Sequence, residues 1–175
     1  MSLKLAELLC SAYVALALPN ADIACENMDV VVEASEQHNV DPAVLTSLIF
    51  VESRWTPSAV SRDGACGLTQ VLPRYSSGFK ARFGKKLTCK QLKDPETSIR
   101  RGAKILEWWI RRYGKGRVST GLCGYNSGFR CKGPTKIKGH RYAKKVLRLT
   151  RVLKRKMKAL EVEEANMVDV PGCYE

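Results

Sequence analysis

Apolar residues recur mainly at helical spacing along this chain, and strand-like alternation is scarce. Asp41-Pro42 is a typical helix start, because Asp caps the first turn and Pro fits within it. The residues that follow, to about Glu52, are apolar on nearly every side of the predicted helix. Such a helix is expected to be buried at the centre of the fold.

Further segments have the same period. Asp94-Pro95 repeats the helix-start signal, and helical spacing then continues until Gly114 stops it. A short helix is predicted from about 118 to 125, and a last long helix begins near Gly139. Because most long segments are predicted to be helical, the expected fold class is mainly α.

At 175 residues the chain is long enough for one domain with a real core, predicted at 28–158, plus two end segments. Segment 1–27 is a poor match to a signal peptide because Glu7 interrupts it, and its apolar run is too short to span a bilayer. The alternative is an amphipathic helix, which would dock on a partner chain or a membrane surface. The leucines near one face of this helix are Leu3, Leu5, Leu8 and Leu9. At the other end of the chain, segment 159–175 turns acidic and loses the helical pattern, as expected of a tail.

The chain is strongly basic, with 30 Lys and Arg against 17 Asp and Glu and a net charge of +13. This balance favours an anionic partner such as the cell envelope, acidic polymers or nucleic acid, although a solvated basic surface is an equal alternative. The sequence contains no recognisable motif that combines phosphate contacts with base readers, so nucleic acid is the less favoured partner. The last helix carries a basic cluster distributed around it: Arg141, Lys144, Lys145, Arg148, Arg151, Lys154, Arg155, Lys156 and Lys158.

The seven cysteines are dispersed and the chain has only two histidines, which argues against a structural zinc site. No metal or organic cofactor is expected. The pairs Cys66 with Cys89 and Cys123 with Cys131 each bracket a loop next to a motif, so they are candidate disulfides suited to an oxidising compartment. Buried free thiols are the alternative.

Glu52 is the leading candidate for chemistry. It lies where the apolar helix breaks into a loop, a position at which desolvation can raise the pKa of a carboxyl group. A general acid needs such a raised pKa to act near neutral pH.

The motifs around Glu52 carry a family resemblance. Between about residues 30 and 149, four elements occur in order that together resemble the signature of lytic transglycosylases of the soluble type, which have a goose-type lysozyme-like fold. The sequence departs from the usual family pattern at Thr69, where Met is common, and at 136–140, where an acidic residue is replaced by basic ones. The matching elements are Glu52-Ser53, Gly64-Ala65-x-Gly67-Leu68-x-Gln70, Asp94-Pro95-x-x-Ser98-Ile99-x-x-Gly102-Ala103 and Gly124-Tyr125-Asn126-Ser127-Gly128, followed by Tyr142 in the closing helix.

The resemblance implies cleavage of the β-1,4 bond between N-acetylmuramic acid and N-acetylglucosamine in peptidoglycan, with a 1,6-anhydro product. Glu52 would act first as acid and then as base, so no second carboxylate is needed. Ser53 and Tyr125 are expected to orient Glu52 by hydrogen bonds. The other implied positions are Gly67, which with Gly64 lets the backbone approach a sugar, Leu68, Tyr142, and the amides of Gln70 and Asn126, which suit acetamido and hydroxyl groups.

Two alternatives remain open. Asp63 would make an inverting muramidase with Glu52 if the two carboxylates were roughly 6.5–9.5 Å apart across the cleft. The other alternative is a non-catalytic virion or nucleic-acid-binding protein. The expected place of action is the periplasm or cell wall, for either a phage particle or a secretion-system enzyme, with contacts to other virion or secretion-machine proteins through the terminal segments.

Overall fold

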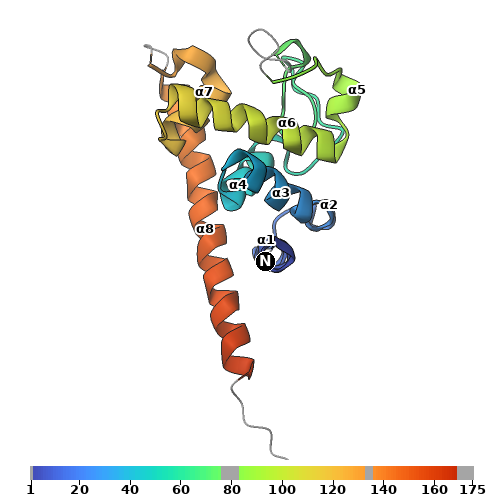
Figure 1. The fold of residues 1–175 in the computed structure, drawn as a ribbon, viewed down its shortest axis with the longest axis vertical. Helices are drawn as coiled ribbons and strands as arrows, with labels where there is room; N and C mark the ends of the chain where they lie inside the picture. Colours follow the sequence, from blue (N-terminus) through green and yellow to red (C-terminus); the bar gives the residue numbers. More distant parts are fainter. Residues whose placement is uncertain (1, 76–82, 133–135, 169–175) are drawn as a thin grey trace, which may run out of the picture.

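The computed structural model describes residues 2–75, 83–132 and 136–168, and these ranges are mainly helical (Figure 1). Strand pairing within them is limited to isolated bridges of Val60 with Cys66 and of Cys66 with Val71. The mainly α class expected from the sequence is therefore confirmed. The helices are α1 (Ser2–Ala15), α2 (Ala21–Glu26), α3 (Met28–His38), α4 (Pro42–Ser53), α5 (Cys89–Leu92), α6 (Pro95–Trp108), α7 (Val118–Ser127) and α8 (Lys136–Val168), with a π-helical turn η3 (Trp109–Tyr113) and 3-10 turns η1 (Pro73–Tyr75) and η4 (Gly128–Lys132).

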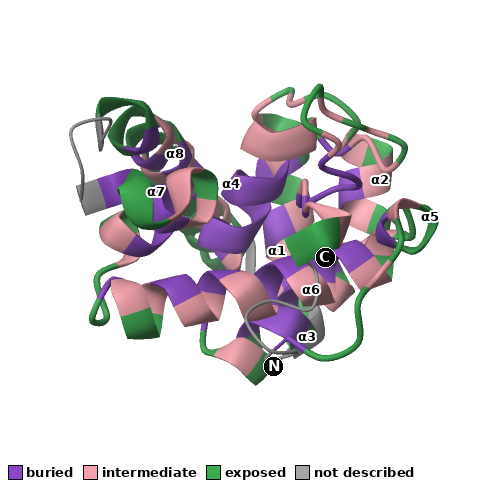
Figure 2. Ribbon diagram, turned by 90° about the horizontal axis from the view of Figure 1, so that it is seen from above, coloured by how far each residue is buried: buried purple, intermediate pink, exposed green. Residues whose placement is uncertain are grey.

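Helix α4 is the buried central helix that the sequence predicts (Figure 2). The Asp41 carboxylate caps it by accepting hydrogen bonds from the backbone N–H groups of Ala43 and Val44. Every residue from 43 to 49 is buried, and the helix packs against α3 and α8. Its C-terminal end, which carries Glu52, is thereby fixed by elements from both halves of the chain.

Helices α6 and α7 also begin where the sequence predicts. Asp94 caps α6 by accepting from the backbone N–H of Thr97 at 2.9 Å, and Gly114 ends the π-helical turn that continues α6. Close packing between the two helices depends on glycine, since a Cβ added at Gly124 would lie 2.4 Å from the ring of Trp109. This contact positions Tyr125, the next residue of α7.

The N-terminal segment is part of the same folded unit, contrary to the expected boundary at residue 28. Helix α1 packs against α3 and α8, and its residues Leu9, Ala12 and Tyr13 are fully buried. The Tyr13 ring meets the Trp55 ring edge-on, at 6.1 Å between centroids. The apolar face expected to dock on a partner is therefore directed largely into the protein's own core. Among the described residues, no helix combines the length and apolar character needed to cross a membrane.

Helix α8 extends further than the sequence pattern suggests. It runs for 33 residues, so the predicted tail is helical from 159 to Val168. It packs on α1, α4 and α7, whereas residues 161–166 are exposed and extend beyond most of the other helices (Figure 1). The acidic segment is thus a continuation of the helix with few contacts: Leu160 packs against the core, and Glu164 lies 3.7 Å from Lys4 of α1.

Three disulfides connect neighbouring elements. The predicted pairs Cys66–Cys89 and Cys123–Cys131 are confirmed, so the alternative of free thiols is wrong for these four residues. A third bond, Cys10–Cys25, ties α1 to α2 and was not predicted from the sequence.

Candidate active site

Glu52 lies in the last turn of α4, immediately before a sharp change in chain direction. Arg54 and Trp55 both adopt left-handed backbone conformations, with φ of 52° and 59°. Such conformations are uncommon for residues other than glycine, and here the fully buried Trp55 side chain anchors the turn. The helix therefore ends just beyond Glu52 and leaves its carboxyl group at the junction of helix and loop.

Tyr142, from α8, binds this carboxyl group directly. Its hydroxyl donates a hydrogen bond to Glu52 Oε1 at 2.5 Å. Burial raises the pKa of Glu52 from 4.5 to about 7, while the Tyr142 hydrogen bond and the charge of Lys145 pull that pKa down. The result is a carboxyl group that can hold or release a proton near neutral pH, as expected of a general acid.

Lys145 is a member of the site that the sequence analysis did not single out. It lies one helical turn after Tyr142 on α8, and its positive charge stabilises the ionised form of Glu52. The signal available in the sequence was its spacing of three residues from Tyr142. That signal is ambiguous on a helix with so many basic residues.

Ser53 does not orient Glu52, contrary to expectation. Its hydroxyl donates to the carbonyl oxygen of Leu68 at 2.8 Å and to that of Ile49 at 3.2 Å. Leu68 itself is fully buried. The bond between Ser53 and Leu68 therefore attaches the loop 59–71 to the end of α4, next to Glu52.

Tyr125 also bonds to this loop and not to Glu52. Its hydroxyl donates to the Thr69 carbonyl at 2.8 Å. Burial and the charge of Glu52 raise the pKa of Tyr125 and of Tyr142, so both keep their hydroxyl protons over the working pH range. Tyr125 is thus a neutral side chain close to the carboxylate, fixed in place by the loop.

Thr69 replaces the methionine that is usual in the family, and its hydroxyl is used in the core. It donates to the Ser98 carbonyl at 2.8 Å, and the Ser98 hydroxyl accepts from the Thr69 backbone N–H at 3.1 Å. A Cβ added at Gly102 would lie 2.4 Å from the Thr69 side chain, so α6 approaches the loop as closely as glycine permits. The substitution keeps the Thr69 carbonyl in position for Tyr125.

Gly67 and Gln70 shape the loop internally. Gly67 has φ of 77°, and a Cβ there would lie 1.7 Å from the Leu92 carbonyl oxygen. Contact with α5 is therefore sufficient by itself to require glycine here. The Gln70 side-chain amide donates to the carbonyls of Gly67 at 2.9 Å and Ala59 at 3.2 Å, so its N–H groups serve the loop and not a ligand.

Asn126 and Asp63 are both exposed, with different consequences. Asn126 lies near the end of α7 beside Tyr125, and its Oδ1 accepts from the Ser127 hydroxyl at 3.1 Å, which leaves its amide nitrogen available to substrate. Asp63 lies in a turn closed by a bond from the Gly64 N–H to the Ser61 carbonyl. In the described residues, no hydrogen bond links Asp63 to Glu52 or to another site residue.

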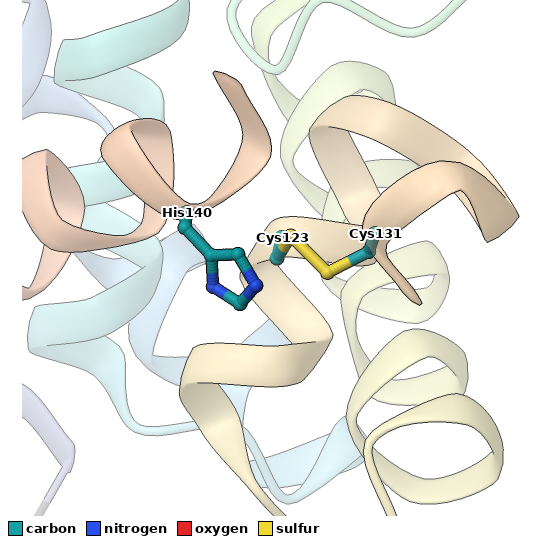
Figure 3. Close-up of side chains that lie close together, drawn as sticks. All are labelled: Cys123, Cys131 and His140. Atoms are coloured by element: carbon teal, nitrogen blue, oxygen red, sulfur yellow. A yellow bond between two sulfur atoms is a disulfide. The ribbon is translucent and has the colours of Figure 1, made fainter. Parts of the chain in front are cut away.

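One group of potential metal ligands occurs among the described residues. Cys123, Cys131 and His140 have ligand atoms within 4.8 Å of one another (Figure 3). The two sulfurs are bonded to each other, however, and only a thiolate is an effective ligand. His140 is then a single imidazole beside a disulfide, which does not form a metal site.

The fold and the site together define a lysozyme-like helical domain in which burial raises the pKa of the Glu52 carboxyl group. Residues 29–147 match the model of the family described as Transglycosylase SLT domain. The chain therefore belongs to this family.

Relatives of known name share part of the chain. A transglycosylase of Enterobacteria phage PRD1 is 34% identical over 95 residues, which cover 54% of this chain and 32% of that protein. An endo-type membrane-bound lytic murein transglycosylase A of Klebsiella pneumoniae is 35% identical over 86 residues, covering 47% of this chain and 42% of its own. The chain thus matches less than half the length of each.

Solved structures of lytic transglycosylases share the fold. The 70 kDa soluble enzyme of Escherichia coli superposes with a TM-score of 0.65 at 20% identity, covering 85% of this chain and 29% of that one. An inactive mutant of the Pseudomonas aeruginosa enzyme Slt gives a TM-score of 0.64 at 17% identity, with coverages of 86% and 30%. These similarities support the predicted lysozyme-like fold.

Proposed function

We propose that this protein is a peptidoglycan lytic transglycosylase, which cleaves the β-1,4 bond from N-acetylmuramic acid to N-acetylglucosamine. The observation that carries the proposal is the Glu52 carboxyl group, with a pKa of about 7 and a Tyr142 hydrogen bond, in a chain of the SLT family. The named relatives are a transglycosylase of a phage and a membrane-bound lytic murein transglycosylase of a bacterium.

The proposed reaction needs one carboxyl group in two successive states. Protonated Glu52 gives its proton to the glycosidic oxygen, the bond to the muramic C1 breaks, and the substrate's N-acetyl group stabilises the cationic centre. Ionised Glu52 then removes the proton from the muramic C6 hydroxyl, whose oxygen bonds to C1. The proton that leaves Glu52 in the first step is replaced in the second, so the residue returns to its starting state without water.

Tyr142 suits the ionised state of Glu52 in this cycle. Its hydroxyl donates to Glu52 Oε1 and stabilises the carboxylate formed after the first proton transfer. Lys145 contributes in the same direction. Burial opposes both and keeps Glu52 partly protonated at neutral pH, as the first step requires.

A second carboxylate has little support. The hydrolytic alternative needs an acid placed to activate water, and Asp63 sits in an exposed turn, with no hydrogen bond to a site residue in the described parts of the chain. The amide of Asn126 is the better candidate for a substrate contact, through the acetamido and hydroxyl groups of the glycan.

The proposed setting is the cell wall or periplasm, reached either in a phage particle or by export. Three disulfides favour an oxidising compartment. Partners in a virion or secretion machine would have an accessible surface at the exposed end of α8, residues 161–166.

The test is mass spectrometry of the products released from purified peptidoglycan. Wild-type protein is expected to release muropeptides ending in 1,6-anhydromuramic acid, and Glu52→Gln to lower their rate of release by about 100-fold to 10,000-fold. Asp63→Asn is the matched control and should leave the rate unchanged. Reducing-end products, heavier by one water and lost in Asp63→Asn, would instead establish the hydrolase.

A further inference from the structure

Six of the nine basic residues predicted on the last helix share one exposed stripe of α8, whereas Lys145, Lys154 and Lys156 lie outside it. The inward side of the helix is marked by buried residues at spacings of three and four: Ala143, Val146, Thr150 and Leu153. At the 3.6-residue period of a helix, the stripe lies roughly 150° around the axis from this buried row. The stripe, called here the α8 basic stripe, consists of the exposed residues Arg141, Lys144, Arg148, Arg151, Arg155 and Lys158.

The charge of this stripe is not neutralised within the described protein. Residues 138–158 include no Asp or Glu. The one described ion pair of this segment joins Asp41 to Lys154, which points away from the stripe. Like charges three and four residues apart destabilise a helix, and a face that serves only solubility normally mixes both signs. An exposed helix face that carries only positive charges, as this stripe does, is therefore uncommon.

We propose that the α8 basic stripe binds the anionic lipid headgroups of a membrane surface. Its six cations lie along a straight helix over roughly 25 Å, so a flat surface can meet all of them at once. A nucleic-acid duplex has a curved backbone, and the stripe includes no Asn, Gln or aromatic side chain to complement its Arg and Lys in reading bases. The interaction would be electrostatic adsorption, because no apolar residue lies among these six positions.

The direction of the stripe is compatible with the reaction at Glu52. Tyr142, which contacts Glu52, also lies roughly 150° around α8 from the centre of the stripe. A protein adsorbed through the stripe would thus direct its catalytic candidate away from the membrane. The proposal does not depend on the reaction, since adsorption requires only these charges.

Vesicle cosedimentation of the full chain tests the proposal. Wild-type protein should bind vesicles of phosphatidylcholine with phosphatidylglycerol, but not phosphatidylcholine alone, and should be released in about 1 M salt, where the Debye length falls to roughly 3 Å. The triple variant Arg148→Gln, Arg151→Gln, Arg155→Gln should bind roughly 100-fold more weakly. Glutamine retains good helix propensity, and circular dichroism verifies that this variant and the control variant described next are folded.

The matched control removes the same charge elsewhere, through Lys86→Gln, Lys90→Gln, Lys93→Gln, at exposed positions in and beside α5. It should bind vesicles within a few-fold of wild type, whereas an equal loss in both variants would overturn the stripe in favour of net charge alone. Duplex DNA, added as a competitor of the vesicles, tests whether the stripe binds nucleic acid instead. If the stripe variant loses DNA binding but keeps vesicle binding, the surface is a nucleic-acid site. Glu52→Gln should bind vesicles as wild type does, so this test and that of the reaction fail independently.

Discussion

At the scale of single residues, Tyr142 sets the pH at which Glu52 can act as an acid. Its hydrogen bond to the carboxylate lowers the pKa of Glu52, so Tyr142→Phe should raise that pKa above 7. Since the first step needs protonated Glu52, the alkaline limb of the pH profile of kcat/KM should move up by about one to two pH units. Tyr13→Phe removes a hydroxyl that bonds to the Pro19 carbonyl instead, and should leave the profile unchanged. An unmoved limb in Tyr142→Phe would exclude Glu52 as the group that titrates there.

Burial of the Glu52 carboxyl group lowers the free energy of unfolding at high pH, where this group is ionised. The folded state raises its pKa from 4.5 to about 7, so the folded protein binds more protons than the unfolded chain between these values. Stability should fall as pH rises through this window and then level off. Glu52→Gln, which never ionises, should therefore stabilise the protein relative to wild type at pH 8 but not at pH 4, by a difference on the order of 3 kcal/mol. Denaturant unfolding at the two pH values measures this difference, and the same stability gain at both would contradict it.

At the scale of elements, the loop 59–71 is the support of the site. The carbonyl oxygens of Leu68 and Thr69 in this loop accept hydrogen bonds from the hydroxyls of Ser53 and Tyr125. Gly67 packs on the backbone of Leu92. The disulfide Cys66–Cys89 fastens the same loop to α5. The position of Tyr125 therefore depends on a contact with the loop and not on a direct bond to Glu52.

Two disulfides allow the effect of the loop on catalysis to be separated from the effect of a lost disulfide on stability. Replacing both cysteines of Cys66–Cys89 or of Cys10–Cys25 with alanine should lower the free energy of unfolding by about 2–4 kcal/mol in each case. Only the first pair holds the loop, so only its loss should also reduce kcat/KM at a temperature where both variants are folded. Equal kinetic losses would show that the loop keeps its geometry without the Cys66–Cys89 bond.

The sequence predicts those elements whose signals are local. Asp41 and Asp94 mark helix starts because a cap bonds within its own first turn, and the apolar surroundings of Glu52 are evident from neighbouring residues. The partners of Ser53 and Tyr125 are backbone carbonyls 15 and 56 residues away, which only the folded chain brings together. Gly67 likewise contacts a distant backbone at Leu92, a constraint that its family motif alone does not show.

At the scale of the whole molecule, the N-terminal helix completes the core beneath the site. Leu9 and Tyr13 of α1 are fully buried, and Tyr13 contacts Trp55, the residue that anchors the turn after Glu52. Residue spacing predicted an amphipathic helix here but could not show that its partner was α3 and α8 of the same chain. Removal of this helix should therefore affect the site as well as the stability.

The boundary at residue 28 is tested by deleting residues 1–27. Burial of each large apolar side chain contributes about 1.5–3 kcal/mol, and native proteins are stable by only about 5–15 kcal/mol in total. The fragment 28–175 should thus lose most of its stability, with Trp55 exposed to water and its fluorescence shifted to the red. The fragment 1–164, which lacks the exposed residues 165 and 166 and those that follow them, is the control and should unfold at the denaturant midpoint of the full chain. If 28–175 unfolds at that midpoint too, α1 and α2 are accessory and the domain begins at α3, because burial of Tyr13 against Trp55 would then contribute nothing that the remaining helices cannot supply.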